Sequence, residues 1–300
     1  MTENEIFEIL LKNSLNELKK VVNLNESVEI EPYEKMLGDI IRDNIKTYIA
    51  YDIADVQPLN SPNGIMLARP TRLDKFEIIK KSISVKTKKN SYKVTQEFID
   101  DLNAVSGTTE IFQDFVISKT KNDETMDLVN FLKTNAIAVS NLTLPQEAKE
   151  NNETNLFYIN KKVNDEIIKL NKTNFRTFDG FCILPQSQAG GILGMSFTYS
   201  KINQQLSSLN RANNFYLGSV NNVKYYLNPD SSADDVIVGL NSKIERGVSS
   251  LIYCPYSIIT NSALDNNTGE KIYNIWVRDL YEINPLHSTT NPLLVKFKIQ

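Results

Sequence analysis

Residues 55–64 read DVQPLNSPNG and join an amphipathic helix to an apolar strand. Pro58 and Pro62 fix the backbone φ angle and have no N–H to donate, so they stiffen this corner. Asn63 and Gly64 favour a turn with positive φ. The corner carries no obvious catalytic side chain, and we therefore interpret it as a defined structural turn rather than as a catalytic loop.

Two amphipathic helices are predicted before the corner. The first covers residues 2–22 and begins with a capping box formed by Thr2 and Glu5. Its apolar residues fall on one face: Phe7, Leu10, Leu11, Leu15, Leu18 and Val22. The second helix is predicted over residues 34–50, where Leu37, Ile40, Ile41, Ile45 and Tyr48 recur at helical spacing. After the corner, residues 65–68 predict a short buried strand.

Residues 71–93 concentrate positive charge and predict a basic hairpin or extended arm. The lysines are Lys80, Lys81, Lys86, Lys88, Lys89 and Lys93, with Ile78, Ile79, Ile83 and Val85 between them. Binding of a polyanion is one interpretation of this pattern. A solvated two-stranded arm with lysine-protected edges is favoured, because aromatic side chains do not alternate with the lysines.

The rest of the chain predicts a mixture of helices and strands, and hence an α+β fold. A long helix is expected over residues 109–135, where Phe112, Phe115, Val116, Met126, Val129 and Leu132 form a stripe that would span roughly 40 Å. Shorter helices are expected at residues 95–102, 163–170 and 203–209. Strands are expected at residues 156–159, 181–184, 223–227, 236–239, 273–277 and 293–299.

Composition excludes several classes of protein. With 300 residues, of which 41% are hydrophobic, the chain can bury a sizeable core. The formal net charge of -3 gives no global reason to bind nucleic acid or an anionic membrane. The apolar stretches are much shorter than the roughly 20 residues of a membrane helix, and the acidic N-terminus is not a secretory signal. A soluble protein made in the cytoplasm is expected.

A search for catalytic or ligand-binding chemistry gives no positive support for an enzyme. Cys182 and Cys254 lie in apolar runs and predict buried free thiols. Because the chain has a single histidine, His287, the sequence disfavours a zinc site. The glycines at 190–194 lack the spacing of a phosphate-binding loop, and the acidic pairs at 100–101 and 234–235 predict solvated carboxylates. We predict no catalytic, cofactor-binding or metal-binding residues and no cofactor.

The corner resembles a stretch in the major capsid proteins of T-even-like tailed bacteriophages, and the resemblance continues in order along residues 34–290. It includes residues 49–53, 92–107, 216–218, 238–239 and 252–256. The family-like structural positions are Gln57, Pro58, Asn60, Pro62, Gly64, Tyr253, Pro255, Tyr256, Arg278, Asn284 and Pro285.

The resemblance implies an HK-97-type phage capsid fold. On this plan, residues 1–33 form an N-terminal helix or arm, and residues 34–70 form the helix of the arm and the corner. Residues 71–92 form a short extended loop. Residues 93–140 and 251–300 form the peripheral domain with its spine helix, and residues 141–250 form the axial domain.

The implied function is a major capsid protein that self-assembles into hexamers and pentamers of an icosahedral or prolate head shell around the phage genome. A pentamer-forming vertex protein and an encapsulin-like compartment shell remain alternatives. The implied partners are other copies of the chain and scaffold, portal, vertex and prohead protease proteins, with only weak non-specific contact with packaged DNA and none with a membrane. The implied location is the virion, after assembly in the host cytoplasm.

Two further expectations concern assembly. Leu24-Asn25-Glu26 before Ser27 resembles a prohead protease site, so residues 1–26 are a candidate pro-segment cleaved between Glu26 and Ser27. Lys86, Lys88 and Lys89 are predicted to contact a neighbouring subunit, because apolar residues and lysines alternate in the segment that the family uses as its extended loop.

Overall fold

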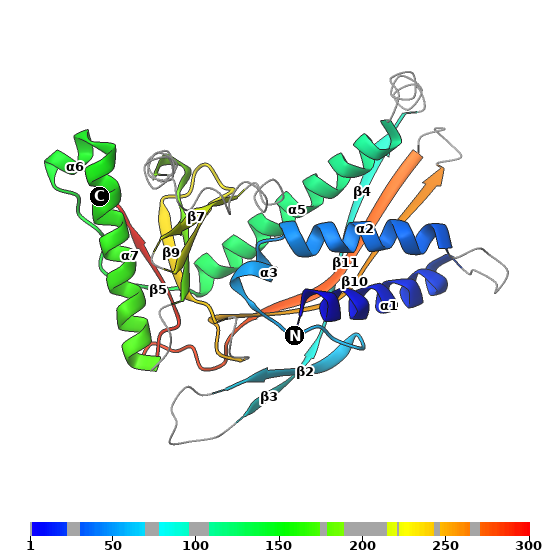
Figure 1. Ribbon diagram of the computed structural model, residues 1–300, viewed down its shortest axis with the longest axis horizontal. Helices are drawn as coiled ribbons and strands as arrows, with labels where there is room; N and C mark the ends of the chain where they lie inside the picture. Colours follow the sequence, from blue (N-terminus) through cyan, green and yellow to red (C-terminus); the bar gives the residue numbers. More distant parts are fainter. Residues whose placement is uncertain are drawn as a thin grey trace.

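The computed structural model describes residues 2–22, 31–69, 78–95, 108–174, 179–188, 215–220, 222–242, 247–264 and 271–300. These residues form an α+β structure with two main sheets and a separate hairpin (Figure 1). The predicted helices at 95–102 and 203–209, the glycines at 190–194, the acidic pair at 100–101 and the candidate cleavage site at Glu26 and Ser27 lie outside the residues that the structure describes.

Both predicted N-terminal helices are present. Helix α1 spans Glu3–Val22, and its capping box is confirmed, because Thr2 N donates to Glu5 Oε2 at 2.8 Å and Glu5 N donates to Thr2 Oγ1 at 3.3 Å. Helix α2 spans Glu31–Thr47 and is followed by the short helix α3, Ala50–Ile53. Leu10 of α1 and Ile41 of α2 are fully buried in one apolar cluster with residues of the long sheet.

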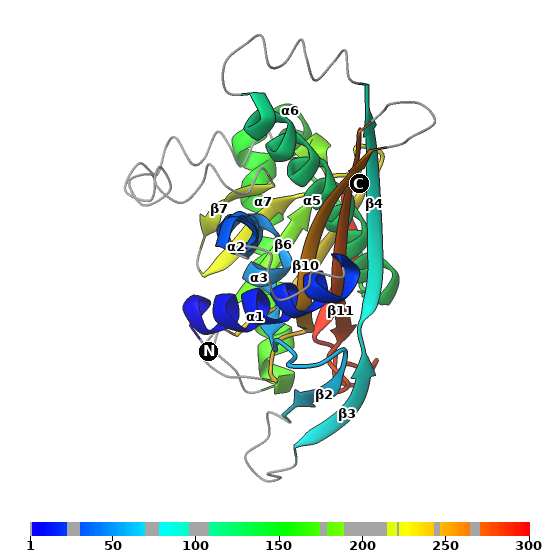
Figure 2. The same cartoon turned by 90° about the vertical axis from the view of Figure 1, so that its right-hand side faces the viewer.

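The long sheet has four strands in the order β1-β10-β11-β4. They are β1 Asp55–Val56, β10 Leu251–Leu264, β11 Lys271–Ile283 and β4 Lys86–Val94. Strand β1 pairs with β10 in parallel, and the other neighbours are antiparallel. Figure 2 views this sheet nearly edge-on, with α1, α2 and α5 lying to one side of β4.

The second sheet has six strands in the order β5-β12-β9-β6-β8-β7. They are β5 Ile137–Ala138, β12 Leu294–Lys298, β9 Asp235–Leu240, β6 Gly180–Leu184, β8 Val223–Leu227 and β7 Tyr216–Val220. Every residue of β6 and β9 is buried. A strand that is covered on both faces needs a continuous apolar run, and residues 181–184 supply one.

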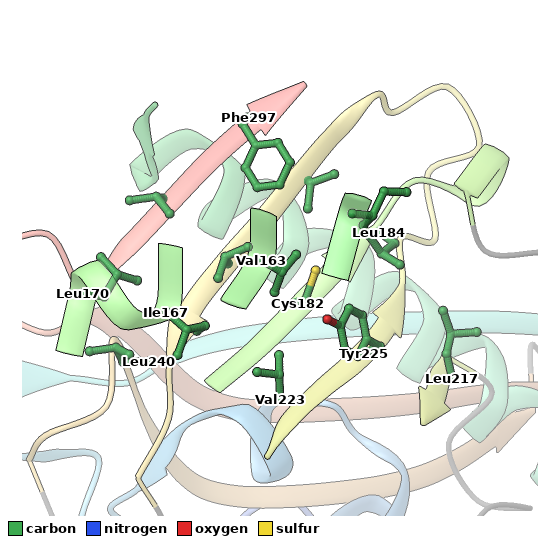
Figure 3. Packing of buried hydrophobic residues seen from close by; sticks show 14 of the residues in the cluster. Val163, Ile167, Leu170, Cys182, Leu184, Leu217, Val223, Tyr225, Leu240 and Phe297 are labelled. Carbon is green, nitrogen blue, oxygen red and sulfur yellow. The ribbon is translucent and has the colours of Figure 1, made fainter. Parts of the chain in front are cut away.

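The two faces of β6 belong to different apolar clusters. Cys182 and Leu184 pack with Val163 and Ile167 of helix α7, Asn152–Asn174 (Figure 3). Phe181 and Ile183 instead share a cluster with Leu128 and Leu132 of helix α5, Thr108–Asn135, and with residues of α3. The six-stranded sheet is therefore held between α7 and α5.

The predicted strand at residues 156–159 is wrong. These residues belong to α7, and the buried side chains Leu156, Ile159, Val163 and Ile167 repeat every three or four residues as one face of a helix. The short helix α6, Gln146–Glu150, precedes it.

The long helix predicted at 109–135 is confirmed as α5, but its apolar stripe is partly wrong. Val129 and Leu132 are buried as expected, whereas Met126 is 40% exposed and Leu128 is fully buried in its place. The side chains of Phe112, Phe115 and Val116 lie outside the described part of the structure.

The predicted hairpin over residues 71–93 is wrong in its pairing. Strand β3, Ile79–Ser84, pairs with β2, Asn63–Ala68, whereas β4 joins β11 in the long sheet. Strand β2 was expected to be buried, but only Met66 and Ala68 are, while Ile65 is 56% exposed. The hairpin of β2 and β3 lies at the lower edge of the molecule in Figure 1, and its buried residues Met66, Ala68 and Ile83 pack in one apolar cluster with Ile252, Cys254 and Leu280 of the long sheet.

The strands do not divide along the predicted domain boundaries. Strands β5 and β12 come from the ranges assigned to the peripheral domain, yet they lie in the same sheet as β6, β8 and β9 from residues 141–250. Strand β4 overlaps the range assigned to the extended loop but is part of the long sheet. The domain assignment stays a prediction, which these pairings would revise at residues 86–94 and 294–298.

Candidate functional site

The corner continues β1 along the outer edge of β10. Gln57 N donates to Tyr253 O at 2.8 Å, and Leu59 N donates to Pro255 O at 3.0 Å. Pro58 lies between these two donors, at the position where an extended chain would turn its N–H away from β10. Its missing N–H therefore costs no sheet hydrogen bond, and the chain resists further strand pairing there.

The side chain of Gln57 fastens the hairpin to the corner. Its Oε1 accepts a hydrogen bond from Leu67 N at 2.8 Å, and its Nε2 donates to Leu67 O at 2.7 Å. Nε2 also donates a hydrogen bond to Asp55 Oδ2 at 2.7 Å. The side-chain amide of Gln57 thus pairs with the backbone of Leu67 as a residue of a neighbouring strand would. This gives the family-like Gln57 a defined structural role.

The predicted positive-φ turn at Asn63 and Gly64 is wrong, because both residues are extended and begin β2. Gly64 instead leaves room for the buried Leu59, because a Cβ built there would lie 2.7 Å from Cδ2 of that side chain. The chain bends at residues 60–62 instead, and the bond from Val85 N to Pro62 O at 2.9 Å extends the pairing of β2 with β3. Asn60 is exposed.

A second junction joins the corner to the segments before β10 and after β11. Asp55 Oδ2 accepts a hydrogen bond from Gly247 N at 2.6 Å, and Gly247 O accepts from Arg69 N at 2.9 Å and from Asn284 Nδ2 at 3.0 Å. Asn284 Nδ2 also donates to Ser249 O at 2.9 Å. Asn284 is fully buried and binds three segments together, whereas the adjacent Pro285 is exposed.

We expect Gly247→Ala to destabilise the subunit by about 2 kcal/mol or more. Gly247 has a φ of 76°, and a Cβ there would lie 2.8 Å from the backbone nitrogen of Arg69. Gly38→Ala in α2 is the matched control, since its nearest neighbour would be Phe7 Cζ at 3.6 Å and alanine is favoured in a helix by roughly 0.5–1 kcal/mol. Urea unfolding of both variants measures the difference, and equal midpoints would contradict the expectation.

Helix α1 covers the next part of the β10 edge with polar side chains. Asn13 Nδ2 donates to Leu59 O at 2.7 Å and to Tyr256 O at 2.9 Å. Ser14 Oγ accepts from Ile258 N at 3.0 Å. These buried side chains supply the hydrogen bonds that another strand would otherwise make with β10.

Glu17 completes this contact through two family-like residues. Tyr256 donates its hydroxyl to Glu17 Oε1 at 3.0 Å, and Arg278 Nη1 donates to Glu17 Oε2. Burial alone would raise the pKa of Glu17, but hydrogen bonds from Lys20 and Tyr256 and the charge of Arg278 lower the pKa overall. The carboxylate form is therefore the one that holds α1 on the sheet.

The sequence analysis missed Asn13, Ser14 and Glu17 as structural contacts. A signal was present: these polar residues sit between the buried Leu10 and Leu18, inside the apolar face of α1. Polar residues in an apolar stripe are buried only when they are hydrogen-bonded, so they indicate a backbone edge or a charge on the partner element.

The three predicted contact lysines divide into two kinds. Lys86 and Lys89 are exposed on β4, and Lys89 Nζ lies 5.4 Å from the centre of the Trp276 ring. Lys88 instead faces inward, with its Nζ 3.6 Å from Oδ1 of the buried Asp279. Lys88 is therefore a contact within the subunit, which the sequence analysis did not anticipate.

A buried group of charged and aromatic residues surrounds this pair. Tyr253 donates its hydroxyl to Asp279 Oδ2 at 3.0 Å, and Lys88 Nζ lies 4.7 Å from the centre of the Tyr281 ring. Glu124 of α5 is buried beside them, and burial together with the charge of Asp279 raises the pKa of Glu124 to about 8. Burial also raises the pKa of Asp279, although Lys88 opposes the shift.

Other chemical candidates are accounted for within the fold. Cys182 and Cys254 are buried free thiols as predicted, and burial raises the pKa of Cys254 to about 12. His287 Nδ1 accepts a hydrogen bond from Leu293 N at 3.0 Å. Of the predicted solvated pair, Asp234 is exposed, but Asp235 is buried 2.8 Å from Lys133 Nζ.

Among the described residues, no group of three or more histidine, cysteine or carboxylate side chains is placed to hold a metal ion. None of the described helices is both long and apolar enough to cross a membrane. The junctions built from the family-like residues bind backbone and side chains of this chain, and their evident role is to fix the sheet edge.

Most of the chain matches one family of known proteins. A family model described as major capsid protein Gp23 matches residues 69–297. A virus-like particle from Pyrococcus furiosus is 12% identical, with 88% of this chain and 98% of that chain covered and a TM-score of 0.52. At this identity the likeness shows a shared fold.

Two further solved structures are similar to the chain. A phage-related protein from Bordetella bronchiseptica RB50 is 12% identical, covers 85% of this chain and 91% of its own, and has a TM-score of 0.49. The satellite phage P4 procapsid is 9% identical, with 89% and 99% covered and a TM-score of 0.48. No curated protein sequence matches this chain.

Proposed function

The chain belongs to the major capsid protein Gp23 family, and from this premise we propose how its shell is built. The protein is a shell-forming capsid subunit with an HK-97-type fold. We infer that it assembles into hexamers and pentamers that close a phage head around the genome. The proposal rests on the family match over residues 69–297. The matched range includes both long strands of the four-stranded sheet, β10 and β11.

The arrangement of the subunit suits repeated heterologous contacts. Its long sheet is stiffened along one edge by β1, the corner and α1, while the hairpin of β2 and β3 packs one face against the long sheet and exposes the other. Exposed apolar side chains on that hairpin, Ile65 and Leu67, are suited to burial against a neighbour. Many such contacts of modest energy add up to a durable container.

Electron microscopy of the purified full-length protein tests this function. We expect rings of six or five subunits, or closed shells. Counting copies per particle separates a major subunit, which occupies most positions, from a vertex protein confined to pentamers. A persistent monomer at high protein concentration would contradict the proposal. An encapsulin-like shell would enclose protein cargo rather than DNA, which nuclease protection of the particle's nucleic acid distinguishes.

We predict that Lys86→Glu combined with Lys89→Glu lowers the yield of assembled shells by roughly tenfold, because reversed charges in an interface repel their partners. Both side chains are exposed, so the isolated subunit should unfold at the same urea concentration as the unchanged protein. Lys149→Glu, on the exposed surface of α6, is the matched control. Unchanged assembly of the double variant would refute the contact.

The remaining partners follow from the family. We infer that scaffold, portal, vertex and prohead protease proteins act with this subunit, and that assembly takes place in the host cytoplasm. Cleavage between Glu26 and Ser27 is part of the same proposal. Intact-mass measurement of subunits from mature particles tests it, and a mass that retains residues 1–26 would exclude it.

A further inference from the structure

The connection between β11 and β12, residues 284–293, carries the only histidine of the chain, His287. Strand β11 belongs to the long sheet and β12 to the six-stranded sheet, so this connection is one of the places where the two sheets are joined. No other residue of the connection has an acidic or basic side chain. A change of pH can therefore act directly on the connection only through His287.

The imidazole ring of His287 bridges two separate parts of the fold. Nδ1 accepts a hydrogen bond from Leu293 N at 3.0 Å, and Nε2 lies 3.2 Å from the backbone oxygen of Asn135, the last residue of α5. A backbone N–H can only donate, and a carbonyl oxygen can only accept. The two partners together require the neutral ring with its hydrogen on Nε2 and a lone pair on Nδ1.

Both partners of the ring are backbone groups at the end of an element. The carbonyl of Asn135 is among the last four of α5, which have no N–H partner within the helix. Leu293 is fully buried just before β12, and its own carbonyl accepts a hydrogen bond from Leu240 N of β9 at 3.0 Å. The ring therefore holds the end of α5 against the residue that leads the chain into the six-stranded sheet.

Protonation of Nδ1 would affect the two hydrogen bonds in opposite ways. The bond from Nε2 to Asn135 O becomes charge-assisted, and a cation is favourable at the C-terminal end of a helix. The bond from Leu293 N is lost, because Nδ1 then carries a hydrogen and two donors face each other. A buried N–H without an acceptor destabilises the connection. The ring would thus remain on α5 and release Leu293.

The charged groups on the neighbouring elements do not offset this loss. Near the end of α5, Lys133 Nζ lies 2.8 Å from Asp235 of β9, and Lys296 of β12 donates to the Lys133 carbonyl at 2.7 Å. Farther along β12, Lys298 donates to Asp234 at 2.7 Å. Both of these acids are engaged by lysines, so neither is placed as a counter-ion for a protonated ring.

Burial lowers the pKa of His287, and the hydrogen bond to Asn135 O only partly opposes this shift. A histidine in an unfolded chain has a pKa of about 6.5. The stability that the ring contributes is therefore present in full above this pH. It is lost as the pH falls below about 6.5 toward the pKa of the folded state, because the unfolded chain binds the proton more readily.

We propose that His287 is a pH-sensitive latch that ties the C-terminal end of α5 to the connection between the two sheets. The neutral ring closes the latch, and protonation opens it. Opening frees the start of β12 from the ring but leaves the hydrogen bonds within each sheet in place. Acidification thereby loosens the joint between the sheets, and the subunit gains freedom to change the angle between them.

NMR of the full-length protein, labelled in its histidine nitrogens, tests the closed state. His287 is the only histidine, so every imidazole signal belongs to it. Magic-angle spinning reads these signals from free subunits and from shells alike, so the result does not depend on assembly. At about pH 8 we expect a hydrogen on Nε2 and none on Nδ1, with a titration midpoint below about 6.5. A hydrogen on Nδ1 under these conditions, or a midpoint at or above that of an unfolded chain, would overturn the proposal.

Amide hydrogen exchange tests the opening. We expect the protection of the Leu293 amide, corrected for the intrinsic effect of pH on exchange, to fall roughly tenfold between about pH 8 and about pH 5. The amides of β6, which is buried throughout in the six-stranded sheet, are the internal reference and should keep their protection. Unchanged protection at Leu293 would contradict the latch.

His287→Asn is the matched variant. The asparagine Oδ1 can take the place of Nδ1 as the acceptor for Leu293 N, but the side chain gains no proton in this pH range. Its protection at Leu293 should be the same at both pH values. Glu124, whose pKa is raised to about 8, titrates in both proteins, so its effect cancels in the comparison. The same fall in the asparagine variant would show that another group opens the connection. If the variant does not fold, the NMR titration of the unchanged protein still decides.

Discussion

Lys88→Glu is expected to prevent stable folding of the subunit. The change places a third carboxyl group beside Asp279 and Glu124, both of which are buried, and removes the cation that lies 3.6 Å from Asp279. Loss of one partner from a buried ion pair costs about 3–5 kcal/mol, and the added like charge makes the cost larger. Since domains of this kind are stable by only about 5–15 kcal/mol, most of the stability would be lost.

Lys89→Glu on the same strand is the control for this prediction. Lys89 is exposed and lies over the Trp276 ring, so the change should cost less than about 1 kcal/mol. Circular dichroism during urea unfolding gives both midpoints. If Lys88→Glu unfolds at the same urea concentration as Lys89→Glu, then Lys88 does not lie in the buried cluster. The difference between Lys88 and Lys89 also matters for assembly experiments. A charge reversal that includes Lys88 would lower the assembly yield by unfolding the subunit, and this loss could be mistaken for a lost contact between subunits.

Local patterns were sufficient to predict most elements. The capping box and apolar stripe of α1, the length of α5 and the alternation in β11 each arise from residues close together in the sequence. The strand predicted at residues 156–159 failed for the same reason. Four consecutive residues rich in apolar and aromatic side chains do not reveal whether their period is two or 3.6, and only the continuation to Val163 and Ile167 identifies the helix.

The junctions were less predictable because their partners are distant in the sequence. The rigidity of the corner followed from Pro58 and Pro62, but the contact of Asp55 with Gly247 crosses most of the chain. Lys88 looked like its neighbours Lys86 and Lys89 until the pairing of β4 with β11 placed it beside Asp279. Which lysine turns inward depends on strand register, and that register is set by residues far along the chain.

The buried polar residues of α1 were overlooked because their partner is an edge of the long sheet, which the sequence of the helix does not reveal. A free strand edge invites pairing with any other chain, which is a particular hazard for a subunit that must meet many copies of itself in a controlled way. In this protein β1, the corner and α1 cover successive parts of the β10 edge. From Ile252 to Ile258 this edge is covered within the subunit, so we expect contacts between subunits to use other surfaces.

Removal of residues 1–26 from the isolated subunit is therefore expected to destabilise it by roughly 5 kcal/mol or more. Ile6, Leu10 and Leu18 are buried, and burial of such a side chain stabilises by about 1.5–3 kcal/mol. The truncation also leaves Arg278 without Glu17 and exposes the backbone of β10 at Tyr256 and Ile258. We expect a lower urea midpoint and aggregation through the uncovered edge.

Substitutions within α1 show whether the destabilisation by the truncation comes from the buried contacts of the helix. Alanine at Glu8, Lys12 and Lys19 alters only exposed positions of the helix and should change stability by less than about 0.5 kcal/mol each. Asn13→Ala leaves Leu59 O and Tyr256 O without their donor and should cost about 1–3 kcal/mol. If the truncated subunit is as stable as the full chain, α1 is dispensable for the fold. If it is unstable alone but the cleaved form persists in mature particles, a neighbouring subunit must cover the β10 edge after cleavage, and the loss of α1 would then commit each subunit to the shell.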